Sequence, residues 1–559
     1  MTKKILIIGG VAGGATAAAR LRRIDEHSNI ILFERGEHIS FANCGLPYYI
    51  GESIKQREKL LVQTVEGMSK RFNLDIRNLS EVTSINREQK TIMVKNLRTE
   101  ESYEENYDVL ILSPGAKPIV PNIPGLREAN HIFTLRNIPD TDRIKGFVDQ
   151  QQPKEAVVIG GGFIGLEMAE NLAERGVKVT IVEMANQVMA PLDYEMASIV
   201  HNHLVEKGAQ LILEDGVQSF EDQGNTVVLN SGKRINTDLI ILSIGVTPEN
   251  NLANNARLAV GERGGIQVNE FMQTSDENIY ALGDAIEVRD YINGHATMIP
   301  LAGPANRQGR IVANNIYGKK ETYKGTLGTS IAKVFDLTVA TTGNNEKVLN
   351  RIGTPYKVVH IHPASHASYY PGAHPIALKL IFDEQTGAIY GAQAVGKDGV
   401  DKRIDVIATA IKGKLTVFDL TELELSYAPP FSSAKDPVNM AGYVASNMID
   451  ANIQTVQWHE IDQIVQDGGL LIDVREPKER DNGFIPGSIN IPLDELRNRL
   501  DELPKDQPIY LSCQVGLRGY LGTQILLGHG YNAINVDGGW KTYSSVFKGN
   551  KVHAVGCKG

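Results

Sequence analysis

One pattern occurs twice in the first half of this chain of 559 residues: a buried strand, a glycine-rich turn, a helix and a second strand that ends at an acid. The first copy has these parts at residues 4–8, 9–14, 15–24, 30–33 and Glu34. The second copy has them at residues 156–159, 160–165, 166 to about 175, 179–182 and Glu183. Amides at such a helix start bind pyrophosphate, and the acid binds ribose hydroxyls. Two copies therefore predict two dinucleotide-binding βαβ domains.

The two turns are not equally regular. The second turn carries the complete glycine fingerprint at Gly160, Gly162 and Gly165, whereas the first has Val11 where the middle glycine is expected. A single fingerprint is weak evidence, but two copies that each end at an acid are strong evidence.

Composition restricts the kind of protein. Hydrophobic residues make up 42% and charged residues 22% of the chain, as in ordinary soluble globular proteins. The formal net charge of −9 argues against a nucleic-acid surface over the whole protein. The apolar run at residues 5–8 is too short for a signal peptide or a membrane span. We expect a cytoplasmic protein without a nucleic-acid or membrane partner.

Cys44 has no partner cysteine nearby, because only Cys513 and Cys557 exist besides it. Three cysteines do not make a disulfide framework, which favours a reducing compartment. Alone, Cys44 cannot form a disulfide within its own loop. Its oxidised form is therefore a mixed disulfide with a substrate thiol, a persulfide or a sulfenic acid.

The later parts of the chain have other patterns. Residues 326–447 contain strand-like runs and then a helix near 400–413, which predicts an α+β domain. Residues 448–456 are predicted to be a linker, and residues 457–559 a compact α/β domain with strands near 470–474, 508–512 and 533–537.

The chain resembles the flavoprotein pyridine nucleotide-disulfide reductases in four segments. They are the two glycine turns, the stretch from Ser40 to Tyr49 around Cys44, and Ala281 to Ala285. The similar branch holds CoA-disulfide reductase, NADH oxidase and NADH peroxidase. The resemblance implies a homodimer that uses FAD and NAD(P)H. It implies an FAD-binding domain at 1–149 plus 271–325, an NAD(P)H-binding domain at 150–270 and a dimerisation domain at 326–447.

The resemblance also implies cofactor-binding residues, with no metal site. They are Gly9, Gly10, Ala12, Gly13, Gly14, Glu34, Arg35, Asn43, Pro114, Gly115, Gly160, Gly162, Phe163, Ile164, Gly165, Glu183, Gly245, Gly283, Asp284 and Ala302. A carboxylate at Glu183 accepts ribose hydroxyls and repels the extra phosphate of NADPH. NADH is therefore favoured, and NADPH stays possible.

Three features favour CoA-disulfide reductase within the branch. Ala12 stands where the peroxidase carries a histidine, and Tyr369 and Tyr427 resemble tyrosines that reach the active site from the partner subunit. A phenol can protonate a leaving thiolate. Cationic and polar residues resemble that family's coenzyme A positions: Thr16, Arg20, Arg23, Ser40, Asn43, Arg71, Asn306 and Arg310.

The C-terminal domain resembles a single-domain rhodanese, a sulfurtransferase. Its active loop is expected from Cys513 to Arg518, with backbone amides pointing at the sulfur and Gly516 at the tightest bend. Arg518 is expected to add positive charge toward an anionic sulfur donor. The related phosphatases have a longer loop, so sulfur chemistry is favoured over phosphate chemistry. Cys557 reads as a thiol of the terminal tail.

Together these features predict an FAD-dependent NAD(P)H oxidoreductase joined to a rhodanese domain. Cys44 would act on CoA disulfide, CoA persulfide or a polysulfide, and the sequence does not rank these. The alternatives are an NADH oxidase that cycles through a sulfenic acid, and a redox sensor that uses the rhodanese fold as a binding module. Intact residues from Cys513 to Arg518 argue against the binding module.

Overall fold

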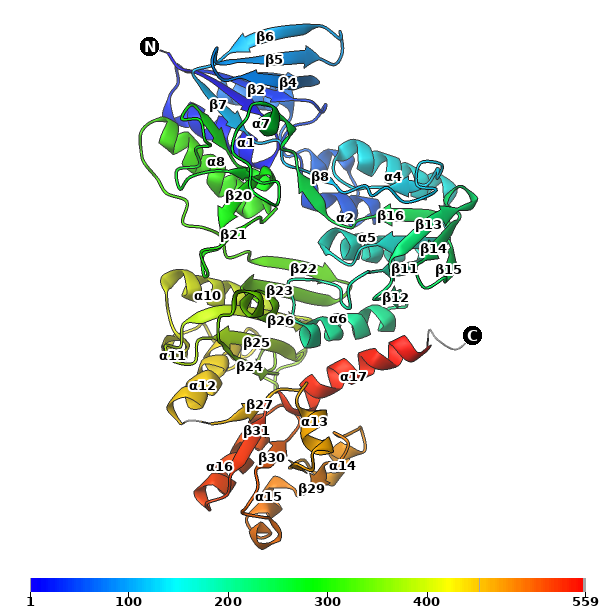
Figure 1. The fold of residues 1–559 in the computed structure, drawn as a ribbon, viewed down its shortest axis with the longest axis vertical. Helices are drawn as coiled ribbons and strands as arrows, with labels where there is room; N and C mark the ends of the chain where they lie inside the picture. Colours follow the sequence, from blue (N-terminus) through cyan, green and yellow to red (C-terminus); the bar gives the residue numbers. More distant parts are fainter. Residues whose placement is uncertain (1, 452, 556–559) are drawn as a thin grey trace. The chain divides into compact units, whose positions relative to one another are not determined.

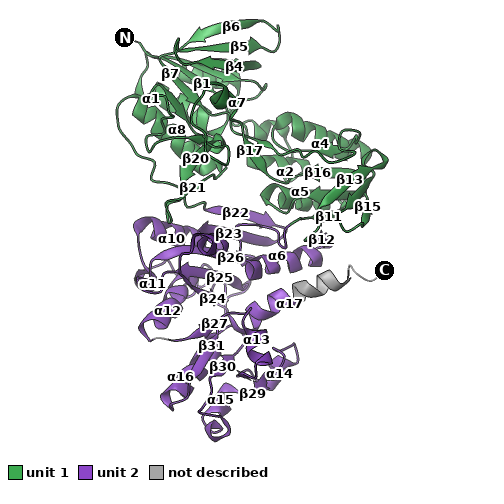
Figure 2. Cartoon of the chain, in the orientation of Figure 1, with its two compact units in different colours: residues 1–184, 214–328 green, residues 185–213, 329–559 purple. Residues whose placement is uncertain are grey.

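A computed structural model describes residues 2–451 and 453–555 (Figure 1). The chain forms two compact units, residues 1–184 with 214–328 and residues 185–213 with 329–559 (Figure 2). Within the described residues, no helix is long and apolar enough to cross a membrane.

Two parallel sheets form the frame of the first unit, one for each copy of the repeated pattern. The first sheet has the order β19-β7-β1-β2-β3, with bounds Ile279–Ala281, Val109–Leu112, Lys4–Ile8, Asn29–Glu34 and Asp75–Asn78. The second contains β11-β10-β16-β9, at Lys178–Val182, Glu155–Ile159, Leu239–Leu242 and Ile132–Phe133. The central strands are buried on both faces, which explains their unbroken apolar runs.

The helix of the first copy, α1 (Ala12–Ile24), packs closely on α8 (Ala302–Ile316). Small residues allow this approach, because a Cβ on Gly309 of α8 would lie 2.4 Å from the Gly13 carbonyl oxygen of α1. The helix begins earlier than the predicted residue 15, directly after Val11. The equivalent helix of the second copy is α5 (Phe163–Glu174). The unit also contains two three-stranded antiparallel sheets: β4-β5-β6 at Ser80–Asn86, Thr91–Asn96 and Ser102–Asn106, and β13-β14-β15 at Val217–Glu221, Thr226–Leu229 and Arg234–Asn236.

The second unit combines an antiparallel sheet and a parallel sheet. The antiparallel sheet has the order β22-β23-β26-β25-β24, at Ser330–Val334, Leu337–Gly343, Ile389–Gly396, Ile376–Phe382 and Lys357–Ile361. It packs against α10 (Val400–Gly413) and α12 (Pro437–Asp450). The parallel sheet has the order β27-β31-β30-β28-β29, at Thr455–Val456, Ala533–Val536, Ile509–Ser512, Leu470–Asp473 and Ile489–Asn490.

The fold class is therefore α/β with an added α+β domain, as predicted. The predicted linker, residues 448–456, is too long: α12 continues to Asp450, and β27 pairs with β31 as an edge strand of the C-terminal sheet. A strand of two residues leaves no detectable alternation in the sequence. Cys557 lies outside the described residues.

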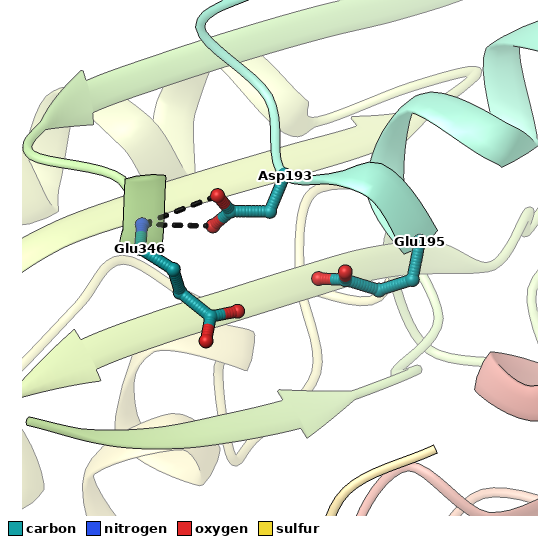
Figure 3. Close-up of side chains that lie close together, drawn as sticks. All are labelled: Asp193, Glu195 and Glu346. Carbon is teal, nitrogen blue, oxygen red and sulfur yellow. Dashed lines mark hydrogen bonds between the residues drawn. The ribbon is translucent and has the colours of Figure 1, made fainter. Parts of the chain in front are cut away.

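A buried ionic cluster lies between the antiparallel sheet and α6 (Tyr194–Glu206) of the second unit. The carboxylates of Asp193, Glu195 and Glu346 converge, and the amide of Glu346 donates to Asp193 (Figure 3). Three acids in this arrangement resemble a metal site. The ammonium of Lys379, however, lies 2.9 Å from Asp193 Oδ2 and 2.5 Å from Glu195 Oε1, and it also bonds to Glu346. A side chain of the protein thus already supplies the cation.

The cluster continues into the C-terminal domain through His360. Its Nδ1 lies 2.7 Å from Oδ2 of Asp537, the residue after β31. Its Nε2 lies 3.0 Å from Glu195 Oε1. Because each ring nitrogen faces a carboxylate, both carry a proton. Burial alone would lower the pKa of His360, but the two carboxylates outweigh burial and raise the pKa to about 9.

We predict that His360→Gln destabilises the second unit in a pH-dependent way. A histidine whose pKa rises from 6.5 to about 9 on folding contributes stability below pH 6.5, and this contribution is lost as pH rises through about 9. The difference from wild type should be roughly 3 kcal/mol at about pH 6 and should vanish near pH 10. Urea unfolding followed by the fluorescence of Trp458 and Trp540, the two tryptophans of the chain, measures it.

His295→Gln is the matched control, because His295 is exposed in the first unit. A difference for His360→Gln that stays constant from about pH 6 to about pH 10 would show that His360 is not a charged link.

Candidate active sites

A cavity of about 510 Å³ lies in the first unit at the carboxyl end of β1. Its lining includes most residues expected to bind FAD: Gly9, Gly10, Ala12, Gly13, Glu34, Arg35, Asn43, Pro114, Gly115, Gly283 and Asp284. This volume is typical of a small-molecule site. The amides of the glycine turn suit a pyrophosphate, so the donor set fits an adenine dinucleotide.

Two expected FAD residues are not part of this lining. Gly14 is a packing residue, because a Cβ there would lie 1.9 Å from the Gly9 carbonyl oxygen. Ala302 is exposed at the first residue of α8. Arg35, in contrast, lines the cavity and donates to Glu249 Oε1 at 2.6 Å, an acid that Arg136 also contacts.

The acid at the end of each repeat makes the same contact in both copies. Glu34 Oε2 accepts from the Gly10 amide at 2.9 Å, and Glu183 Oε2 accepts from the Gly161 amide at 2.7 Å. Each carboxylate thus holds its own glycine turn. The internal repeat seen in the sequence is therefore also a repeat of hydrogen bonding.

The second turn keeps a space open above the start of α5. Gly160 has φ +105°, a conformation that favours glycine, and a Cβ on Gly165 would lie 2.0 Å from the Gly160 carbonyl oxygen. A Cβ on Gly162, in contrast, would meet nothing within 4 Å. This space suits the phosphates of a second dinucleotide. Three other residues are expected to bind this second dinucleotide. Phe163 and Ile164 begin α5, and Gly245, with φ +120°, follows β16.

Cys44 is exposed in a short 3-10 turn at Asn43–Gly45, beside the cavity residue Asn43. The helix after it, α2 (Leu46–Ile50), begins two residues beyond Cys44. Partial desolvation of the sulfur raises the pKa of the thiol, and the carboxylates of Glu167 and Asp284 raise it further. The protein's own groups therefore favour the neutral thiol at Cys44. A bound oxidised flavin would have to supply the stabilisation of the thiolate.

Glu167 is a residue that the sequence reasoning missed. It lies on α5, which packs against α2, and burial raises its pKa to about 7, with a further contribution from Glu170. Tyr48 of α2 also has a raised pKa of about 12, through burial and then Glu167. A carboxyl that holds a proton near neutrality close to a cysteine is a marker of an active site. Its sequence position within a regular helix gives no signal of this.

The residues expected to bind coenzyme A gather mainly on α1, α8 and α3 (Val65–Phe72). Thr16 donates to Asn306 Oδ1 at 2.6 Å, and Arg20 donates to Asn314 Oδ1 at 3.0 Å. Four of these polar residues are exposed: Arg23, Arg71, Asn306 and Arg310. Ser40 has the left-handed φ of 44° and donates its amide to the Gly10 carbonyl at 2.9 Å, which fixes the loop before Cys44.

Tyr369 and Tyr427 form an exposed pair on the second unit, with their hydroxyl oxygens 2.8 Å apart. The side chains are 75% and 47% exposed, so both are available to a partner. The buried Arg403 of α10 joins the two loops that carry them. It donates to the Ser365 carbonyl at 2.9 Å and to Asp436 Oδ2 at 3.1 Å. Sequence reasoning did not identify Arg403, because its partners are distant in the chain.

Cys513 follows β30 in the C-terminal domain and is 1% exposed. Gly516, with φ +100°, donates its amide to the sulfur at 3.1 Å, as expected for this loop. A second segment holds the loop from behind, because the amides of Trp540 and Lys541 donate to the carbonyls of Cys513 and Gln514. The bend thus presents a backbone amide to a buried sulfur.

Arg518 is the second residue of the helix α16 (Leu517–Gly528), and its guanidinium is paired with an acid. Its two terminal nitrogens donate to the two carboxylate oxygens of Glu479 at 2.6 and 2.7 Å. Glu479 belongs to α14 (Pro477–Arg480), and the sequence analysis did not anticipate this contact. The expected positive charge at the loop is therefore largely offset.

Solved and curated proteins resemble this chain over most of its length. A structure of reduced Bacillus anthracis CoADR-RHD is 64% identical, covers 98% of this chain and 99% of its own, and has a TM-score of 0.97. A NAD-dependent persulfide reductase from A. fulgidus is 37% identical over 97% of this chain and 100% of its own, with a TM-score of 0.90. The coenzyme A disulfide reductase of Staphylococcus haemolyticus is 39% identical and covers 80% of this chain and 100% of its own.

Three family models match successive parts of the chain. The pyridine nucleotide-disulphide oxidoreductase model matches residues 3–309, and the dimerisation domain of the same family matches residues 329–437. The rhodanese-like domain model matches residues 457–545. The chain belongs to the pyridine nucleotide-disulphide oxidoreductase family and carries a rhodanese-like domain at its C-terminal end.

Proposed function

We propose that this protein is an FAD-dependent NAD(P)H oxidoreductase that reduces a disulfide or persulfide of coenzyme A, coupled to a sulfurtransferase domain. The observation that carries the proposal is Cys44, which is exposed beside the dinucleotide cavity and is the only cysteine of the first 512 residues. A single cysteine needs a sulfur partner from the substrate. Two of the relatives named above are a coenzyme A disulfide reductase and a persulfide reductase.

In this proposal, different residues bind the cofactor and carry out the sulfur chemistry. The first glycine turn, Glu34 and Asp284 would hold FAD, which supplies an electron pair taken from NAD(P)H. Cys44 as thiolate attacks the sulfur attached to coenzyme A. The substrate S–S bond breaks, a thiolate or hydrosulfide leaves, and a mixed disulfide forms. The electron pair then breaks this disulfide and restores the thiolate of Cys44.

Recognition of coenzyme A is proposed for the polar face of α1, α3 and α8. Arg20, Arg23 and Arg71 would contact its phosphates, because guanidinium groups form bidentate bonds with phosphate oxygens. Thr16 and Asn306, which already bond to each other, lie on the same pair of helices. NADH is favoured over NADPH, because the carboxylate of Glu183 would face the ribose.

The dimerisation domain matched at residues 329–437 suggests a homodimer. We propose that Tyr369 and Tyr427 complete the active site of the partner subunit and protonate the leaving thiolate. Their exposure and their shared hydrogen bond support this role. A reducing cytoplasm is proposed as the location, since both described cysteines are free.

We predict that Cys44→Ser still binds FAD and accepts electrons from NADH, yet loses turnover of coenzyme A disulfide. Serine occupies the same space but forms no disulfide with the substrate. Flavin absorbance measures the first property, and NADH consumption with substrate measures the second. Turnover above a few per cent of wild type would contradict the role of Cys44, and oxygen consumption with NADH alone would instead identify an oxidase.

We predict that sites are shared between subunits. A Cys44→Ser protomer and a Tyr369→Phe/Tyr427→Phe protomer are each inactive as homodimers. After subunit exchange at equal concentrations, half of the dimers are hybrids with one intact site, so about a quarter of wild-type activity should return. Differently tagged protomers verify the exchange. Confirmed hybrids without activity would place each tyrosine pair outside the partner's site.

We predict that coenzyme A links the two domains. Its thiolate attacks the outer sulfur of a persulfide on Cys513, and the resulting CoA persulfide is the substrate of Cys44. Adding coenzyme A should therefore raise NADH oxidation driven by glutathione persulfide in wild type but not in Cys513→Ser. Direct reduction of coenzyme A disulfide should stay nearly unchanged in that variant. An equal effect of coenzyme A on both proteins would show that the domains work independently.

A further inference from the structure

We infer that the rhodanese domain takes its sulfur from an organic persulfide rather than from thiosulfate, and that Glu479 determines this preference. The inference rests on the proposed sulfurtransferase function and adds the class of donor. It starts from the contact between Glu479 and Arg518, which joins α14 to the helix that follows the Cys513 loop.

Glu479 remains charged at neutral pH. The hydrogen bonds from Arg518 hold the pKa of its carboxyl below the usual value, and the amide of Glu476 and the charge of Arg475 act in the same direction. The side chains of Glu479 and Arg518 are 33% and 32% exposed, so the pair is at the surface. A donor that approaches the terminal nitrogens of Arg518 therefore also meets the carboxylate of Glu479.

The other arginines around the loop are also paired with an acid. Arg475, which donates to the side chain of Gln514, is bonded through two nitrogens to Asp473. Arg480 donates to Asp473 Oδ2 at 2.9 Å. Burial lowers the pKa of Lys541, and its positive charge acts on His362 of the neighbouring domain. Arg475 and Arg480 share the single carboxylate of Asp473, but their side chains are only 1% and 15% exposed, against 32% for Arg518. The pair of Arg518 and Glu479 is therefore the part of these ion pairs that an arriving donor meets first.

The position of the sulfur makes this arrangement selective. Cys513 is 1% exposed, so only a terminal sulfur atom can reach it. In thiosulfate the sulfonate group lies directly behind that atom, at an S–S distance of about 2 Å. Its negative charge would therefore remain near the loop and Glu479. In an organic persulfide a CH₂ group follows the second sulfur, and any charged groups lie several bonds further away.

Exposed apolar side chains favour the same donor. Leu517 belongs to the loop itself and is 57% exposed, and Leu521 is 43% exposed. The two are four residues apart on α16, so they share one face of the helix. This surface can contact the carbon chain of an organic donor, whereas it offers nothing to an inorganic dianion.

The transfer is balanced without an added oxidant. The thiolate of Cys513 attacks the outer sulfur of R–S–SH, and a new S–S bond forms. The old S–S bond breaks, its electron pair leaves with R–S⁻, and this thiolate takes up the proton. The product is a persulfide on Cys513, stabilised by the Gly516 amide.

The test compares donors for wild type and Glu479→Gln in the full-length FAD-loaded protein. Transfer to cyanide is measured from thiosulfate and from glutathione persulfide. Wild type should prefer the persulfide. Removing one charge near the donor should raise kcat/KM for thiosulfate about tenfold and should leave kcat/KM for glutathione persulfide nearly unchanged. The gain should shrink at high salt.

Two variants separate charge from structure. Glu502→Gln removes an acid from another surface pair of the same domain, with Arg499, and should behave as wild type. Glu479→Asp keeps the charge with a shorter side chain and should remain poor with thiosulfate. If Glu479→Gln does not fold, the wild type decides the matter, because high salt should raise its use of thiosulfate relative to glutathione persulfide. A gain in Glu479→Asp as large as in Glu479→Gln would overturn the role of the charge.

Two further outcomes have distinct meanings. Equal use of both donors by wild type, or equal gains for both donors in Glu479→Gln, would overturn the inference alone. No transfer from either donor in wild type would overturn the proposed sulfurtransferase function together with the inference. NADH-dependent reduction of coenzyme A disulfide, which depends on Cys44, serves as an internal measure of intact protein in every assay.

Discussion

The second unit depends on one buried ammonium group. Lys379 is fully buried, and three carboxylates surround it. Removing a charge from water is costly, and such a group is stable only when its partners are well placed. Those partners come from the segment before α6, from α6 itself and from α9 (Glu346–Ile352). A single side chain of β25 therefore aligns elements separated by many residues in the chain.

The same chain of charges reaches the sulfur-transfer loop. Glu195 contacts both Lys379 and His360, and His360 contacts Asp537. After Asp537 come Gly538 and Gly539, and a Cβ on Gly539 would lie 2.4 Å from the Cys513 carbonyl oxygen. The loop around Cys513 is thus supported from outside its own domain. The two described cysteines have different surroundings. Cys44 is exposed beside a cavity, whereas Cys513 is buried and accepts a hydrogen bond from the Gly516 amide.

The sequence predicted those features that arise from local order. The repeated βαβ units, the bend at Gly516 and the helix at 400–413 each follow from residues adjacent in the chain. Contacts between distant residues were not predictable. Glu167 acquires its raised pKa only because α5 packs against α2, and Arg403 joins two loops far apart in sequence. Arg518 was expected to be a free cation, because nothing near it in the sequence indicates that Glu479 binds it.

The contact between His360 and Asp537 makes the C-terminal domain an integrated part of the protein rather than a movable module. A cut between α12 and β27 would leave the imidazolium of His360 without Asp537 on one piece, and an uncovered Asp537 on the other. Each piece would then need substitutions where the cut exposes groups that are now buried in the contact. A fusion of this kind is therefore difficult to reverse in evolution by one deletion. The rhodanese domain of this chain would also be a poor unit to transplant into another protein.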